Sequence, residues 1–401
     1  MKSAVWLYLF LFVAFFDLHA QYPILTPFAV SLGAAPSFVG LVMGMYALTH
    51  LPGNLLAGYG VDRFGSRLFI AASLTAAGVL LIVQSRITNP WHLLYIRSVS
   101  GFVIAFLSPA CLALLARMAR DRIWQGKLMA ANGIIHTVAS VISPAAGAWL
   151  AVRVGFSRAF ETLGWLLMIT GVLALWIIRE PVRLPQAAAI AAAEPRSETP
   201  SGVAPLRGAA RGAKFPWSVM ALPVALACAQ GILAFELPFA AGTAGEEVMR
   251  TGWLFTIISI GALVTLSLLS LQRILPYART VAGAAAMAFC FYLLASGDSA
   301  PMMIVVLFLL GMAKGVVLPA MNTFLLQLSG SSRYGRTFSA LSIAMSIGSF
   351  LGPLLAGNIR ELWSPFFFAF LILMLALLAL APRPLFITGW RDRTSVPPTS
   401  G

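Results

Sequence analysis

The stretch FVGLVMGMYALTHLPGNLLAGYG-VDRFGSR-LFIAASLTAAGVLLIVQS, residues 38–85, places a short charged loop between two long apolar segments. Residues 38–60 and 68–85 are each close to the roughly 20 apolar residues that a helix needs to cross a hydrocarbon layer of about 30 Å. The loop between them, residues 61–67, contains Asp62, Arg63 and Arg67. This pattern predicts a helical hairpin that crosses a membrane twice.

Apolar segments of similar length recur along the whole chain. Of its 401 residues, 60% are hydrophobic and 10% are charged, whereas a soluble domain carries roughly 25% charged residues. Counting the two above, we predict the transmembrane segments 5–30, 38–60, 68–85, 91–116, 127–152, 160–178, 217–243, 250–272, 278–297, 301–328, 336–359 and 363–381. The sequence therefore predicts an all-α membrane protein with twelve transmembrane helices.

The first segment also has features of a secretory signal peptide. Lys2 precedes the apolar residues 4–16, and Leu18-His19-Ala20 resembles a cleavage site. Asp17 and His19 would interrupt the apolar region of a signal peptide, however, and the apolar pattern continues to Phe28. We therefore expect this segment to be the first transmembrane helix.

The two halves of the chain are predicted to be related by duplication. At an almost constant offset of about 210 residues, Pro27-Phe28, Pro109-Ala110 and Pro144 align with Pro238-Phe239, Pro319-Ala320 and Pro353. Residues 179–215 between the halves are rich in Ala, Pro, Arg and Glu and have no apolar period. The predicted organisation is two pseudo-symmetric six-helix bundles with a linker and a tail, over residues 1–178 (N-terminal bundle), 179–215 (cytoplasmic linker), 216–382 (C-terminal bundle) and 383–401 (cytoplasmic tail).

The net charge of +14 is explained by where the basic residues lie. With both chain ends on one side, the segments on that side carry 20 Lys and Arg and those on the other side carry five. An excess of Lys and Arg is typical of the cytoplasmic side. We therefore expect a multi-pass protein of the cell inner (cytoplasmic) membrane with both termini in the cytoplasm, and no nucleic-acid partner.

The charged loop carries the most specific motif of the chain. Residues 58–67, Gly-Tyr-Gly-Val-Asp-Arg-Phe-Gly-Ser-Arg, resemble the Gly-x-Leu-x-Asp-Arg-x-Gly-Arg-Arg/Lys motif of the Major Facilitator Superfamily, with Gly60 for Leu and Ser66 for Arg. The resemblance implies two bundles with the substrate path between them. It also implies a gating role for the matching residues, which are Gly58, Asp62, Arg63, Gly65 and Arg67. A turn with solvated charges is the alternative interpretation.

Two weaker patterns resemble the proton-coupled members of that family. Arg97-Ser98-Val99-Ser100-Gly101 resembles the Arg-x-x-x-Gly motif associated with proton coupling. Residues 139–148 and 348–353 resemble the antiporter motif Gly-x-x-x-Gly-Pro-x-x-Gly-Gly, although the first has Ala and Ser in place of several glycines. Small residues allow close helix packing and Pro bends a helix. The predicted packing and bending residues are Pro144, Gly147, Gly348, Gly352 and Pro353.

Ionisable side chains within the predicted spans are candidates for proton coupling or substrate binding, because such groups are costly in hydrocarbon. These candidates are Asp17, His19, Arg97, His136, Glu236 and Lys314. Either Asp17 or Glu236 is predicted to carry the proton, and Gln21 shares a helix face with Asp17. Lys314 either pairs with Glu236 or holds an anionic substrate group. A structural salt bridge or a packing contact is the alternative for each candidate.

Together these observations predict a secondary transporter that works by alternating access, with proton-coupled efflux of small amphipathic molecules such as a drug, a metabolite or a metallophore-like product. The alternatives are a proton symporter that imports an organic anion and a sensor that keeps the carrier fold. The sequence has no phosphate-binding loop, catalytic elbow or metal-ligand spacing. We therefore expect no enzyme activity, no metal and no cofactor, and function as a monomer in the bilayer.

Overall fold

The computed structural model describes residues 2–118, 122–178, 217–242, 245–268, 274–297, 300–329 and 334–380. These residues form helices and no strand. The helices are α1 (Lys2–Ala20), α2 (Tyr22–Ser31), α3 (Pro36–Phe64), α4 (Ser66–Gln84), α5 (Pro90–Ile104), α6 (Leu107–Met118), α7 (Arg122–Val154), α8 (Phe156–Ile177), the 3-10 turn η1 (Trp217–Met220), α10 (Ala221–Ala241), α11 (Glu246–Ser267), α12 (Pro276–Ser296), α13 (Ala300–Ser329), α14 (Tyr334–Ile359) and α15 (Pro365–Ala379). The predicted linker and tail lie outside the described residues.

Nine described helices, with α5 and α6 taken together, are long and apolar enough to cross a membrane, and the bent pair α1/α2 makes a tenth. Helix α15 is apolar but has only 15 residues. Helix α3 has 29 residues, but the polar side chains of Tyr46, His50 and Asn54 lower its hydropathy. With α1/α2 and α5/α6 each counted as one interrupted span, the described helices follow the predicted order of twelve.

Prolines explain both interruptions. Helices α1 and α2 meet at Gln21 with a bend of 45°, two residues before Pro23. Helix α5 ends at Ile104 and α6 begins at Leu107, because Pro109 has no N–H to donate and its ring collides with the carbonyl four residues earlier, at Ala105. Pro319, which aligns with Pro109 in the repeat, lies inside the uninterrupted helix α13.

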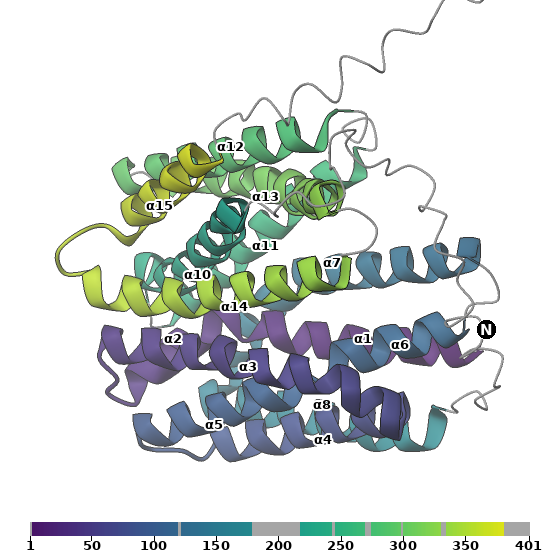
Figure 1. Ribbon diagram of the computed structural model, residues 1–401. Helices are drawn as coiled ribbons and strands as arrows, with labels where there is room; N and C mark the ends of the chain where they lie inside the picture. The colour runs from purple at the N-terminus through teal and green to yellow at the C-terminus, as the bar shows by residue number, and fades with distance from the viewer. Residues whose placement is uncertain are drawn as a thin grey trace, which may run out of the picture.

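The two halves of the chain pack side by side as bundles of nearly parallel helices, α1–α8 in purple to teal and α10–α15 in green to yellow (Figure 1). Across the boundary α3 packs against α14, and α11 packs against α7. Within each half α4 packs on α8, as α12 packs on α15. Each of these contacts therefore has an equivalent contact, made by the corresponding helices of the other half. This is expected for two related bundles with pseudo-twofold symmetry.

The boundary is closed most tightly at one end of the bundle. There the start of α3 meets the end of α14, where a Cβ added to Gly44 would lie 2.7 Å from the Phe350 carbonyl oxygen. On the other side of the boundary a Cβ on Gly252 would lie 2.8 Å from the Pro144 carbonyl oxygen, and Thr256 donates a 2.9 Å hydrogen bond to the Val141 carbonyl. The halves therefore touch backbone to backbone at this end.

The predicted packing residues lie at similar close approaches. Gly147 of α7 lies against Ala20 of α1, and both Gly348 and Gly352 of α14 lie against Cys228 of α10. Pro144 and Pro353 lie inside α7 and α14 without ending either helix. Small residues at these positions allow helices of one half to approach each other closely.

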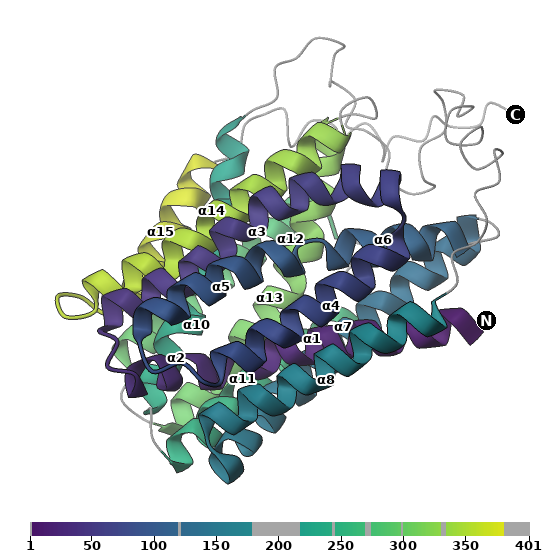
Figure 2. The same cartoon turned by 90° about the horizontal axis from the view of Figure 1, so that it is seen from below.

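The opposite end carries the start of α1, the α3–α4 loop and the start of α7 (Figures 1 and 2). Gly65 alone separates α3 from α4 and has a φ of 94°. This left-handed conformation carries a steric penalty for residues with a Cβ. A tight turn is therefore present at Gly65, within the loop motif.

Candidate functional site

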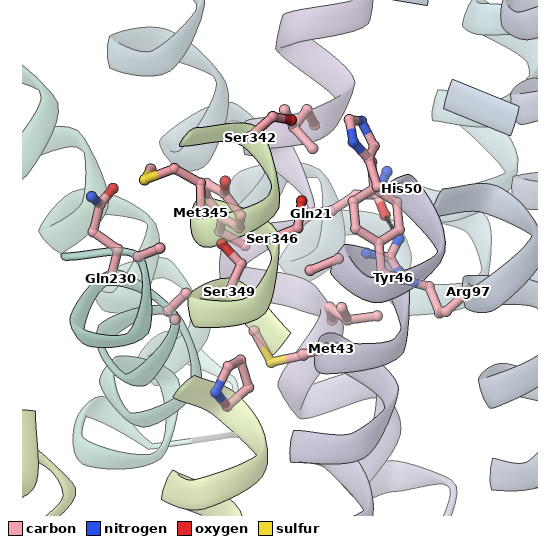
Figure 3. Close-up of a pocket in the computed structure, with 18 residues that line it drawn as sticks. Gln21, Met43, Tyr46, His50, Arg97, Gln230, Ser342, Met345, Ser346 and Ser349 are labelled. Carbon is pink, nitrogen blue, oxygen red and sulfur yellow. Dashed lines mark hydrogen bonds between the residues drawn. The ribbon is translucent and has the colours of Figure 1, made fainter. Parts of the chain in front are cut away.

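A cavity of about 380 Å³ lies between the two halves, within the roughly 300–1,000 Å³ typical of small-molecule sites. Helices α1, α2, α3 and α5 line it from the N-terminal half, and α10 and α14 from the C-terminal half. In Figure 3, Tyr46, His50 and Arg97 lie on one side and Gln230 lies on the other, with the face of α14 between them. The cavity therefore lies where a molecule would contact both bundles at once.

The cavity wall is amphipathic. Apolar side chains such as Leu18, Leu25, Met43 and Met345 alternate with groups that form hydrogen bonds. The polar lining residues are Gln21, Tyr22, Tyr46, His50, Arg97, Gln230, Ser342, Ser346 and Ser349. A pocket with few polar groups on an apolar wall binds molecules that have both apolar surface and hydrogen-bonding groups.

A chain of buried polar side chains begins in this wall. Arg97 Nη1 donates a 2.6 Å hydrogen bond to Gln21 Oε1, and Gln21 Nε2 donates a 2.9 Å hydrogen bond to Asp17 Oδ2. All three residues are only 7% exposed. The Arg97 guanidinium also lies over the ring of Tyr46, 4.4 Å from its centre. Asp17 is therefore connected to the cavity wall by hydrogen bonds through the amide of Gln21.

Two buried polar atoms of this hydrogen-bonded series of side chains remain without a partner. In the described part of the molecule, Asp17 Oδ1 and Arg97 Nε have no hydrogen-bond partner although both are buried. Gln21 directly follows α1, one turn after Asp17, so the two share a face as predicted, and the Gln21 amide reaches Arg97 of α5. A buried carboxylate that keeps one free oxygen and one neutral hydrogen-bond donor can accept a proton without breaking an ion pair.

Helix α3 contributes a second polar stripe. Tyr46 and His50 line the cavity, and Asn54 Nδ2 lies 2.9 Å from His50 Nδ1. The residues are spaced four apart, so they lie on one face of the helix. The stripe leads from the cavity toward the end of α3 that carries the charged loop.

His19 and His136 meet outside the set of residues that line the cavity. The rings of His19 and His136 meet edge to face with centres 5.2 Å apart, and His19 Nδ1 donates a 2.7 Å hydrogen bond to the Phe15 carbonyl. Lys314 lies inside α13 of the other half. The sequence did not predict the contact between the two histidine rings, because it depends on how α1 packs on α7.

Glu236 is paired with Arg360. Nε of Arg360 lies 3.1 Å from each carboxylate oxygen of Glu236, and the guanidinium lies 4.2 Å from the centre of the Phe239 ring. The prediction that Glu236 pairs with Lys314 is therefore wrong. Glu236 lies five residues before the end of α10 and Arg360 directly follows α14, so an Arg at the helix ends reaches the carboxylate.

The charged loop makes contacts within its own half. Arg67 donates a hydrogen bond to the Leu175 carbonyl, in the last turn of α8, where a cation also interacts favourably with the helix dipole. Arg63 donates a 3.1 Å hydrogen bond to the Tyr59 hydroxyl. Gly58 lies within α3, and the side chain of Asp62 lies outside the described part. The loop therefore ties the start of α4 to the end of α8.

The sequence prediction missed the contribution of the C-terminal half to the cavity. Ser342, Ser346 and Ser349 all face the cavity from α14 (Figure 3). Their spacing of four and three residues is a helical stripe that periodicity would have revealed. Gln230, which with Glu236 interrupts the apolar sequence of α10, carried a similar signal.

A family model described as Major Facilitator Superfamily matches residues 7–353 of the chain, and a second match covers residues 280–399. Among curated proteins, the multidrug resistance protein MdtG of Klebsiella pneumoniae (strain 342) is 27% identical over 371 residues, which is 89% of this chain and 86% of the relative. MdtG of Escherichia fergusonii is 25% identical over 307 residues, 74% of this chain and 72% of the relative.

Solved structures with the same fold include two transporters. A bacterial homologue of the human lysosomal transporter Spinster, in an inward-facing and occupied conformation, has a TM-score of 0.71 and 14% identity over 97% of this chain and 96% of that one. The nucleoside transporter NupG has a TM-score of 0.69 and 14% identity over 98% of this chain and 100% of that one. At these identities the likeness concerns the fold alone.

Proposed function

Because the chain belongs to the Major Facilitator Superfamily, a family of membrane transporters, we propose that it exports small amphipathic molecules across the inner membrane in exchange for protons. The observation that carries this proposal is the amphipathic cavity between the two bundles, with a buried carboxylate linked to its wall. A carrier of this kind works by exposing one central site to each side of the membrane in turn.

The distribution of basic residues indicates which side of the membrane has access to the cavity. The end that carries the charged loop has the excess of Lys and Arg, which supports a cytoplasmic position for this end. The opposite end is closed by the backbone contacts of α3 with α14. Along α3, Val39 and Val42 are fully buried at the closed end, whereas Leu55 and Tyr59 are 59% and 67% exposed near the loop. We assign this conformation to the inward-facing state.

Asp17 is the proposed proton site. Its carboxylate is buried beside the cavity and is bound by the neutral amide of Gln21, so protonation would change the charge next to Arg97 without removing a salt bridge. Glu236, the other candidate from the sequence, is held by Arg360 at the closed end of the boundary. A proton on Asp17 and a substrate in the cavity would both act on the Gln21–Arg97 contact, which provides a route for coupling.

The loop residues Gly58, Asp62, Arg63, Gly65 and Arg67 are proposed to control the cycle rather than to bind substrate. Arg67 holds the end of α8 to the α3–α4 turn, so this region of the N-terminal bundle moves as one body. The amphipathic wall and the MdtG relatives, which are named multidrug resistance proteins, support an amphipathic substrate.

Everted membrane vesicles provide the test. When the lumen of everted vesicles that contain the protein is made acidic relative to the bath, a fluorescent amphipathic dye should accumulate as protons leave the lumen, and dissipating the gradient should release the dye. Vesicles that contain the Asp17→Asn variant should not accumulate the dye. Accumulation that is unaffected by the gradient would contradict proton exchange. Accumulation only in right-side-out vesicles would replace export by import.

A further inference from the structure

We infer that the central cavity takes an uncharged amphipathic molecule that accepts hydrogen bonds through an oxygen atom, such as a ketone, ester or amide, and that it excludes organic cations. This inference rests on the proposed function, because it assigns a chemical class to the exported molecule. Two observations carry it. They are the charges in and behind the cavity wall, and the hydrogen-bonding groups of the wall that have no partner in the described part of the protein.

One permanent charge lies in the cavity wall. Of the described residues that line the cavity, Arg97 carries a positive charge, and none is Asp, Glu or Lys. An organic cation in the cavity would therefore lie beside a guanidinium, with no carboxylate in the described wall to bind it. Like charges repel strongly where water is scarce, so this wall disfavours cations.

A second charge lies directly behind the wall. The amide of Gln21 joins Arg97 to Asp17 through hydrogen bonds of 2.6 Å and 2.9 Å, so an ionised Asp17 balances the guanidinium. In the proposed exchange, Asp17 has released its proton to the cytoplasm when the substrate enters. A carboxylate ligand would then add an uncompensated negative charge to a buried site, which is costly. An uncharged ligand leaves the two charges balanced.

Arg97 has hydrogen-bond donors available for such a ligand. Its guanidinium has five N–H groups, and Gln21 is the only described residue that accepts a hydrogen bond from it. The ring of Tyr46 covers one face of the guanidinium, with the ring centre 4.4 Å from Cζ, and the N–H groups point outward in the guanidinium plane. Because Arg97 lines the cavity, an oxygen atom of a bound molecule is the acceptor that would satisfy the remaining donors.

The opposite wall provides neutral hydrogen-bonding groups. The amide nitrogen of Gln230 is buried without a partner in the described part of the chain. No hydrogen bond to a described residue occupies the three hydroxyls that face the cavity from α14, those of Ser342, Ser346 and Ser349 (Figure 3). Hydroxyls elsewhere in the spans donate to a carbonyl one turn earlier, as Ser143 does to Ala139. The unoccupied groups therefore suit a ligand with further polar, uncharged atoms.

Four naphthalenes of nearly the same shape separate the possible ligand charges. 2-Acetonaphthone is neutral and accepts hydrogen bonds, 2-isopropylnaphthalene is neutral and does not, 2-naphthoate is an anion and 2-naphthamidinium is a cation. Each tritiated compound is equilibrated by dialysis between the purified full-length protein and the same detergent solution without protein. Partition into detergent is then equal on both sides, so the excess on the protein side reports binding.

Arg97→Met should bind 2-acetonaphthone roughly 10- to 100-fold more weakly than the wild type, the loss expected for a hydrogen bond from a charged donor. Its affinity for 2-isopropylnaphthalene should stay the same, which also shows that the cavity is intact. Arg158→Met, the matched control, removes an exposed Arg from the start of α8 and should change neither affinity. Equal affinity of the wild type and Arg97→Met for the ketone would overturn the inference.

Asp17→Asn tests the charge balance and does not require Arg97→Met to fold. Removing the carboxylate leaves Arg97 uncompensated, so 2-naphthoate should bind about tenfold more tightly than it binds the wild type, while the affinity for 2-acetonaphthone changes little. Unchanged 2-naphthoate affinity would overturn the inference, as would saturable binding of 2-naphthamidinium to the wild type. These measurements use no proton gradient, so failure of the wild type to accumulate dye in vesicles would count against the proposed function alone.

Discussion

The guanidinium of Arg97 donates a 2.6 Å hydrogen bond to the side-chain oxygen of Gln21, and both residues line the central cavity. Gln21 in turn donates to Asp17, so a neutral amide separates the cation from the carboxylate. A direct ion pair between Arg97 and Asp17 would hold both groups tightly and would leave neither free to bind a proton or a substrate. The amide instead lets each group respond to the other without a permanent bond between them.

Asp17→Asn should abolish proton-driven dye accumulation in everted vesicles and should preserve exchange of dye across the membrane. The amide is isosteric and keeps the contact with Gln21, but it cannot take up and release a proton. Proton-driven accumulation and counterflow, measured in the same vesicles, separate the two activities. Glu236→Gln is the matched control and should retain coupling. If Glu236→Gln lost proton coupling and Asp17→Asn kept it, the proton site would be Glu236 on α10 instead of Asp17.

Glu236 and Arg360 should stabilise the C-terminal bundle as a pair. We expect Glu236→Gln and Arg360→Gln each to lower the thermal midpoint of the purified protein. The thermal midpoint of the double variant should lie close to that of either single variant. Residues in direct contact typically show coupling of roughly 0.5 to 3 kcal/mol, and this partly exposed pair should lie near the lower limit. Additive effects in a double-mutant cycle of midpoints would show that the two side chains do not interact.

Gly44→Ala should open the closed end of the boundary between the halves. The added Cβ would lie 2.7 Å from the Phe350 carbonyl oxygen, and overpacking of this kind costs roughly 1–3 kcal/mol. The readout is labelling of a Met43→Cys cavity residue by a membrane-impermeant thiol reagent added from outside, in a background without the three native cysteines. Its rate should rise about tenfold, because roughly 1.4 kcal/mol corresponds to a factor of ten.

Gly133→Ala serves as the control for this substitution, because a Cβ at Gly133 would meet no atom within 4 Å. Its labelling rate should equal that of the parent. Equal rates in all three proteins would show that the Gly44 contact does not hold the halves together.

Much of the fold follows from the sequence, because hydrocarbon imposes long apolar helices and the loop motif marks the first helix pair. Asp17 and Gln21 were also predictable as neighbours, since residues four apart share a helix face. The partners of Glu236 and His19 were not. Arg360 lies 124 residues from Glu236, and His19 meets His136 only because α1 packs on α7. Likewise, Pro109 and Pro319 align in sequence, yet only the first interrupts its helix.

Arg67→Gln should slow the transport cycle while leaving substrate binding intact. The Arg67 guanidinium donates to the Leu175 carbonyl at the end of α8, far from the cavity-lining residues, and removing it would loosen the turn at Gly65 against that helix. The maximal rate of dye accumulation should fall severalfold, whereas the dye affinity of the purified protein should stay the same. Arg158→Gln, which removes an exposed Arg from the start of α8, should change neither quantity. A fall in dye affinity with an unchanged maximal rate would place Arg67 in substrate binding and would refute its role in gating.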